Sequence, residues 1–106
     1  MIIVKTKEEL KQVIARGEHI FVDNKDLSKK LKLLTYVKYN STIIDTISNS
    51  KSNLIAGATL ASLAGVPVAV AITLISTLGI VCVVAILKDY KIRLNIDGYA
   101  ELEPTR

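Results

Sequence analysis

The sequence has no tryptophan, one phenylalanine (Phe21), one cysteine (Cys82) and one histidine (His19). A single cysteine excludes an internal disulfide, and one histidine without clustered cysteines or carboxylates does not make a zinc site. Cores of this size usually contain buried aromatic side chains, because each brings a large apolar area. Here Ile, Val, Leu and Ala supply most of the apolar mass, a usage closer to that of membrane segments. We therefore expect Cys82 to be a packing residue and the protein to hold no cofactor.

Charge is absent from residues 52–87, a run of 36 positions between Lys51 and Lys88. A helix in water normally keeps a polar face, and this run has no charged position on any face. Near its middle, Gly65-Val66-Pro67 combines a residue that ends helices with one that begins them. The pattern predicts an apolar helical hairpin over residues 53–87 with its turn at 65–67.

The lengths of the two predicted arms differ. The second arm, residues 67–87, is expected to be a single helix of roughly 30 Å, about the thickness of the hydrocarbon core of a bilayer. The apolar part of the first arm, residues 54–64, is too short to span a bilayer alone. We therefore predict that residues 40–52 form an amphipathic lead-in helix that completes this arm.

Both chain ends predict β-structure. Residues 1–39 show a β-α-β-α pattern, with short strands at 2–4 and 20–22 and helix-capping residues after each strand. Residues 90–96 alternate between apolar and polar side chains and predict a strand, and residues 88–106 are expected to form a β-hairpin with its turn at Asp97-Gly98. Because a lone hairpin is marginal in water, we expect an α+β protein whose two ends share one small mixed sheet. Both ends must then lie on the same side of any membrane.

The flanks of the uncharged run are basic. The net charge of +4 arises within residues 1–51, which contain ten Lys/Arg and six Asp/Glu. A basic segment beside an apolar block favours anionic lipid over nucleic acid, since stacking aromatic residues are not interleaved with these cations. The positive-inside bias places both termini in the cytoplasm. The candidate residues for contact with lipid headgroups are Lys29, Lys30, Lys32, Tyr36, Lys38, Tyr39, Lys51, Lys88, Tyr90 and Lys91. The alternative for the run at 29–32 is the solvated face of a helix.

Small residues recur at intervals of four along both arms of the predicted hairpin. They are Gly57, Ala61 and Gly65 on the first arm and Ala69, Thr73 and Thr77 on the second. Such a stripe lets helix backbones approach closely, and this is how helices associate in lipid. Two explanations stay open: the stripe serves only the contact between the two arms, or it also joins protomers into a homo-oligomer.

Signals for catalysis are weak. The sequence contains no G-x-S-x-G, P-loop or G-x-G-x-x-G motif, and the pair Glu8-Glu9 suits the first turn of a helix. We therefore expect no enzymatic activity and identify no small-molecule substrate.

Three segments carry a resemblance to known proteins: KTKEEL at residues 5–10, KKLK at 29–32, and the Gly/Ala-containing hairpin before a lysine-flanked strand. Together they resemble a set of short, uncharacterised bacterial proteins with a basic N-terminal α/β part and an apolar helical hairpin. The resemblance implies a bacterial protein, and because that set has no assigned activity, it implies no functional residues.

Three functions remain open at this stage. The first is a self-associating, non-enzymatic protein of the bacterial inner membrane that anchors, wedges or permeabilises the bilayer. The second is a soluble cytoplasmic homo-oligomer whose hairpins pack into a shared hydrophobic centre. The third is a toxin-like pore former, for which the only polar lumen candidates are Thr59, Ser62, Thr73, Ser76 and Thr77.

Overall fold

Both ends of the chain contribute strands to one four-stranded sheet, as the sequence predicts. In the computed structural model, which describes residues 1–37, 41–50 and 52–105, the strands are β1 (Ile2–Val4), β2 (Ile20–Val22), β3 (Tyr90–Leu94) and β4 (Ala100–Pro104). Their order is β1-β2-β4-β3, with β1 parallel to β2 and the other two pairs antiparallel. The predicted α+β class and mixed sheet built from both ends are therefore confirmed.

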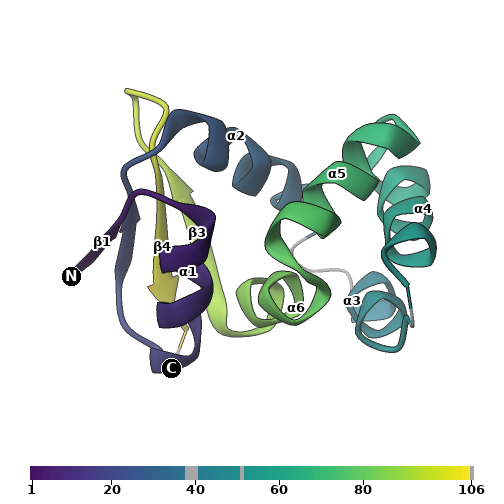
Figure 1. The fold of residues 1–106 in the computed structure, drawn as a ribbon, viewed down its shortest axis with the longest axis horizontal. Coiled ribbons are helices and arrows are strands. Elements are labelled where there is room, and N and C mark those ends of the chain that lie inside the picture. The colour runs from purple at the N-terminus through teal and green to yellow at the C-terminus, as the bar shows by residue number, and fades with distance from the viewer. Residues whose placement is uncertain (38–40, 51, 106) are drawn as a thin grey trace.

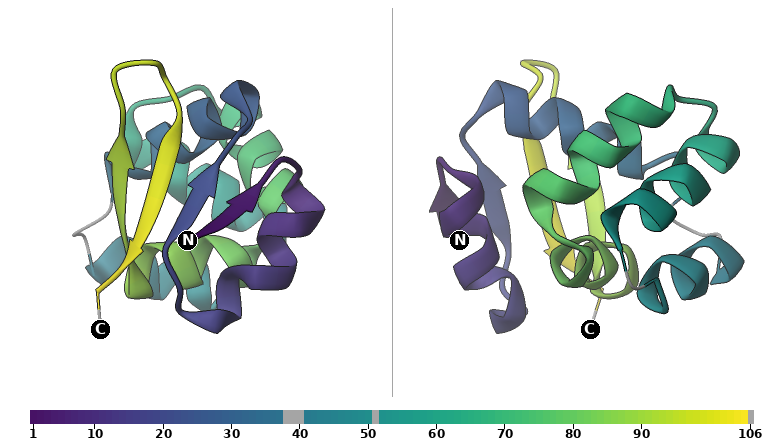
Figure 2. Two further views of the ribbon diagram at one scale, coloured as in Figure 1. Left: turned by 90° about the vertical axis from the view of Figure 1, so that its left-hand side faces the viewer. Right: turned by 45° about the vertical axis from the view of Figure 1, so that its right-hand side comes forward.

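One face of the sheet is buried and the other is open. Alternate residues of each strand point to opposite faces, and the buried set includes Val4, Ile20, Val22, Ala100 and Leu102. The left panel of Figure 2 shows the sheet in front and the helices behind it. The buried hydroxyl of Ser28 ties a helix to this face, because it donates to the carbonyl of Val22 (3.3 Å) and accepts from the amide of Ala100 (2.9 Å).

The described residues form six α-helices and one short 3₁₀ helix. The bounds are α1 (Lys7–Val13), the 3₁₀ helix η1 (Ile14–Arg16), α2 (Lys25–Leu34), α3 (Ser41–Ser48), α4 (Asn53–Ala64), α5 (Val68–Leu78) and α6 (Ile80–Asp89). Helix α1 begins at the predicted N-cap: the Thr6 hydroxyl accepts from the amide of Glu9 (3.1 Å), and the Glu9 carboxylate reaches back to the amide of Lys5 (3.2 Å), one residue before the N-cap residue that a standard capping box uses.

The helices lie in successive layers away from the sheet (Figure 1). Helices α2 and α6 lie beside the sheet, α5 follows, and α3 and α4 lie farthest from it. One continuous core joins these layers, since buried side chains from the sheet and from every helix belong to the same cluster. Helix α3 contributes Ile43, Ile44 and Ile47 to this core.

Three predicted elements differ from the structure. The second arm is not one helix, because α5 and α6 are separated at Gly79 and bent by 90°. The lead-in is a separate helix, α3, and does not continue into α4. Strand β3 ends at Leu94, before the predicted residue 96, because the Asn95 side chain accepts hydrogen bonds from the amides of Asp97 (3.0 Å) and Tyr99 (2.9 Å) and begins the loop early.

By length and apolar character, each helix taken alone in the described part of the chain falls short of what crossing a membrane requires. Helices α5 and α6 reach that length and composition only as a pair, across their 90° bend.

Candidate functional site

Gly79 alone carries the change of direction between α5 and α6. Its backbone angles, φ 83° and ψ 147°, lie in a region that residues with a side chain rarely adopt. Its amide donates to the carbonyl of Ile75 (2.7 Å), and its carbonyl accepts from the amide of Val83 (3.0 Å). Helical hydrogen bonds therefore continue up to Gly79 from both helices. A change in the backbone dihedral angles of this one residue would convert the bent pair into a single straight helix.

The turn between α4 and α5 lies at the predicted residues. Helix α4 ends at Ala64, and Gly65 follows in the left-handed conformation (φ 72°), with its amide bonded to the carbonyl of Ala61 (3.0 Å). Val66 is partly buried against the core, and Pro67 directly precedes α5. The two helices fold back on each other across this turn (Figure 1).

The small residues of α4 are used within the chain. Gly57 is packed so closely on α5 that an added Cβ would lie 2.5 Å from Cγ1 and 2.9 Å from Cα of Ile72. Ala61, one turn later, is also buried. On α5, by contrast, Ala69 and Thr73 are exposed and Thr77 is half-buried. The close contact between α4 and α5 therefore explains why residue 57 is a glycine. The exposed Ala69 and Thr73 of α5 do not lie on that buried contact surface.

Large aliphatic side chains are exposed along the uncharged helices. Val81, at the start of α6, is 83% exposed although it belongs to the run without charge. Among the side chains that the structure describes between residues 53 and 81, the other exposed large aliphatic ones are Leu54, Ile55, Val68 and Val70. Single exposed aliphatic residues are ordinary, but no charged side chain from residues 52–87 accompanies these.

The predicted headgroup residues are divided among several places. Lys29, Lys32, Lys88 and Lys91 are exposed, Lys30 is half-buried, and the Tyr36 side chain is 62% exposed. Lys38, Tyr39 and Lys51 lie outside the described residues.

Tyr90 is not at the surface, which corrects its prediction as an interfacial aromatic residue. It is 1% exposed, and its hydroxyl donates to the carbonyl of Ile14 (2.6 Å). The first residue of β3 points toward the core in this register, and its burial raises the pKa of the phenol.

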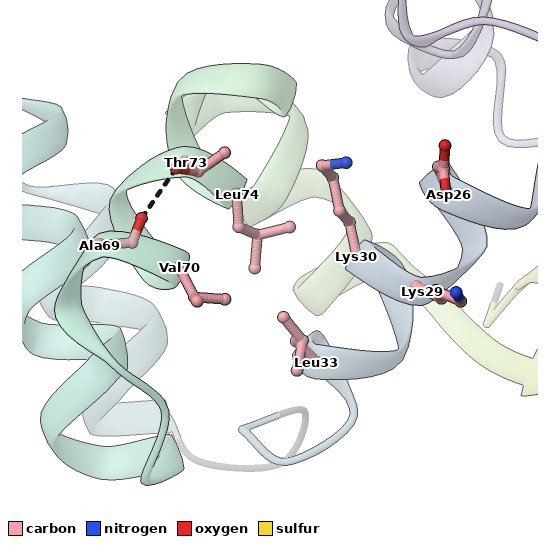
Figure 3. A pocket seen from close by; sticks show the side chains of 8 residues that line it. All are labelled: Asp26, Lys29, Lys30, Leu33, Ala69, Val70, Thr73 and Leu74. Carbon is pink, nitrogen blue, oxygen red and sulfur yellow. Dashed lines mark hydrogen bonds between the residues drawn. The ribbon is translucent and has the colours of Figure 1, made fainter.

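A groove of about 470 Å³ runs between α2 and α5. Figure 3 shows Leu33 from α2 and Val70 and Leu74 from α5 directed toward the space between the two helices. Lys29 and Lys30 lie on the α2 side of the groove. No sequence pattern predicts this groove, because it depends on how α2 and α5 are placed relative to each other.

The remaining chemically active side chains are dispersed. His19 Nε2 lies 3.3 Å from the Glu101 carboxylate on the sheet, and Cys82 is a buried free thiol within α6. Within residues 1–37, 41–50 and 52–105, no three His, Cys, Asp or Glu side chains are grouped so that they could hold a metal ion.

Comparisons with known proteins identified no relative of this chain. No family model, no curated protein and no solved structure matches the chain.

Proposed function

We propose that this protein is a non-enzymatic membrane-associating protein whose uncharged helices enter the bilayer while its sheet stays at the surface. The observation that supports this most is the exposure of Val81 on a 36-residue run without charge, which also exposes Leu54, Ile55, Val68 and Val70 at other points. Transfer of such side chains from water to hydrocarbon is favourable, and no charged group in the run opposes it.

The Gly79 hinge supplies a route to insertion. A straight helix over residues 68–89 would be roughly 33 Å long, enough to cross a hydrocarbon core of about 30 Å. In a straight helix, the amides of residues 80–82 also bond to carbonyls one turn earlier, which the bend prevents. Hydrocarbon favours the straight form because it offers no water to satisfy those groups.

The sheet constrains how the hairpin enters. Strands from both chain ends pair with each other, so an intact sheet keeps both ends on one side of the bilayer. The helices must therefore enter as a hairpin, with α3 and α4 as one arm, α5 and α6 as the other, and the 65–67 turn directed toward the far leaflet. The exposed Lys29, Lys32 and Lys88 suit anionic headgroups on the cytoplasmic side.

Flotation with anionic vesicles tests the proposal. The variant Val81→Lys places a charge near the middle of the proposed span, at a cost of about 2.5–3.5 kcal/mol in hydrocarbon, whereas the largely exposed site tolerates lysine in the compact fold. We expect wild-type protein to float with the vesicles and resist high-salt washing, and Val81→Lys to be lost. The matched control is Ile96→Lys, which adds the same charge at a fully exposed position in the β3–β4 loop.

Equal flotation of wild type and Val81→Lys would contradict insertion through α6. Wild-type protein that stays unbound and shows a concentration-dependent mass without lipid would instead favour the homo-oligomer with a shared hydrophobic centre.

A further inference from the structure

We propose that the groove between α2 and α5 is a binding site for a single-chain anionic amphiphile, of the chemical class of a long-chain fatty acid. This inference concerns the compact protein in water and does not depend on membrane insertion. It rests on the apolar surface of the groove and on the cations along its α2 side.

The walls of the groove suit a hydrocarbon chain. Leu33 and Val70 supply aliphatic surface from the two helices above the buried Leu74, with Ala69 adding a small apolar wall (Figure 3). The Thr73 hydroxyl already donates to the carbonyl of Ala69 (2.8 Å), so its proton is committed within α5. Each methylene group removed from water in such a groove contributes about 0.8 kcal/mol. The volume of about 470 Å³ belongs to a groove that is open to solvent, so a bound chain would lie along the groove rather than inside a closed cavity.

The charges of the groove suit an anionic headgroup. Lys29 and Lys30 outnumber Asp26, the only acidic side chain that lines it. Among the residues that the structure describes, neither Lys29 nor Lys30 forms an ion pair with a carboxylate. In Figure 3, Lys30 lies between Asp26 and the aliphatic side chains of α5. This arrangement places the headgroup of the ligand at Lys30 and its hydrocarbon chain toward Val70.

A ligand in the groove contacts both α2 and α5, two helices that are separated in the sequence by α3 and α4. Because one wall belongs to α2 and the other to α5, the ligand has its full contacts only when these helices are together. Binding to this arrangement alone stabilises the compact fold by mass action. A fatty acid should therefore raise the melting temperature, whereas nonspecific action of a surfactant lowers it.

Two variants on different helices, each introducing a carboxylate, test the site. Fluorescence of a conjugated polyene fatty acid is measured with the protein below the critical micelle concentration, without vesicles. We expect Lys30→Glu and Val70→Glu each to weaken binding about tenfold or more, because each sets a negative charge beside the headgroup or the chain. Both positions are partly exposed, so folding should be preserved, which circular dichroism checks.

The matched controls are Lys32→Glu on α2 and Val68→Glu on α5, which repeat the same changes on the same helices outside the groove lining. They should bind within about twofold of wild type, and a fatty alcohol of equal length should displace the probe less well than the acid. Absence of saturable binding, equal loss in variants and controls, or a lowered melting temperature with the fatty acid would overturn the proposal. Vesicle flotation of the same proteins is read separately, so failure of the groove and failure of membrane insertion are distinguishable.

Discussion

The replacement of Gly57 by alanine tests how closely α4 and α5 are packed. In an ordinary helix this change stabilises by about 0.8–1.0 kcal/mol, because alanine has the higher helix propensity. Here the added methyl would lie 2.5 Å from Ile72 Cγ1 and 2.9 Å from Ile72 Cα, where ordinary van der Waals contact begins near 3.4 Å. A side-chain atom can rotate away, but a backbone atom cannot, so the two helices must move apart.

The expected magnitude follows from these opposing effects. Overpacking of this kind typically costs about 1–3 kcal/mol, and the propensity gain offsets about 1 kcal/mol of it. We therefore predict that Gly57→Ala lowers the free energy of unfolding by about 1 kcal/mol and that Gly57→Leu lowers it much further. Urea denaturation followed by circular dichroism at the helix band measures both.

A neighbouring position serves as the control. Ala58 is exposed on the same helix, so Ala58→Gly reports the propensity difference alone and should cost about 1 kcal/mol. In an Ile72→Ala background, the penalty at Gly57 should shrink but persist, because the contact with the Ile72 backbone remains. If Gly57→Ala stabilised the protein by about 1 kcal/mol, the close α4–α5 contact would be refuted.

Three further changes probe other parts of the fold. Ser28→Ala should lower the free energy of unfolding by about 1–3 kcal/mol in urea denaturation, because the buried amide of Ala100 loses its acceptor. Tyr90→Phe should cost about 1 kcal/mol near neutral pH, through loss of the hydrogen bond to Ile14. Burial raises the pKa of Tyr90 above the ordinary tyrosine value of 10.0, so the wild type should lose stability as pH rises beyond 10 while Tyr90→Phe loses less. Gly79→Ala should destabilise the compact fold by about 1–3 kcal/mol, measured by thermal denaturation, and should increase vesicle binding, because alanine disfavours the bent backbone and favours a straight helix.

Local sequence signals were sufficient for the strands and for the starts of α1 and α2. The N-cap bond between Thr6 and Glu9 lies within four residues, and the apolar run Ile20-Phe21-Val22 pairs as a strand between β1 and β4. The sequence also placed Gly65 and Pro67 at a helix boundary, since both residues act on the backbone directly. These features needed no knowledge of distant contacts.

Three features depend on tertiary packing and could not be predicted from local sequence: the bend at Gly79, the burial of Tyr90 and the groove between α2 and α5. A single glycine within an apolar helical run is normally tolerated, so nothing local marked Gly79 as the site of a 90° bend. The sequence also left the environment of Tyr90 ambiguous. An aromatic residue beside Lys88 and Lys91 suits a membrane interface, whereas the position of Tyr90 in the sheet directs its side chain toward Ile14. The groove beside Lys30 arises only when α2 lies against α5.

The separation between residues 70 and 88 tests the proposed insertion most directly. Spin labels at Val70→Cys and Lys88→Cys, in a Cys82→Ala background, lie on either side of Gly79 at exposed positions. At about 1.5 Å per residue, two helical legs at the observed right angle give a backbone separation of roughly 19 Å, and a straight helix gives roughly 27 Å. Pulsed electron spin resonance should give the shorter distance in water and the longer one with anionic vesicles. Vesicle-bound protein that keeps the shorter distance would contradict insertion by straightening at Gly79.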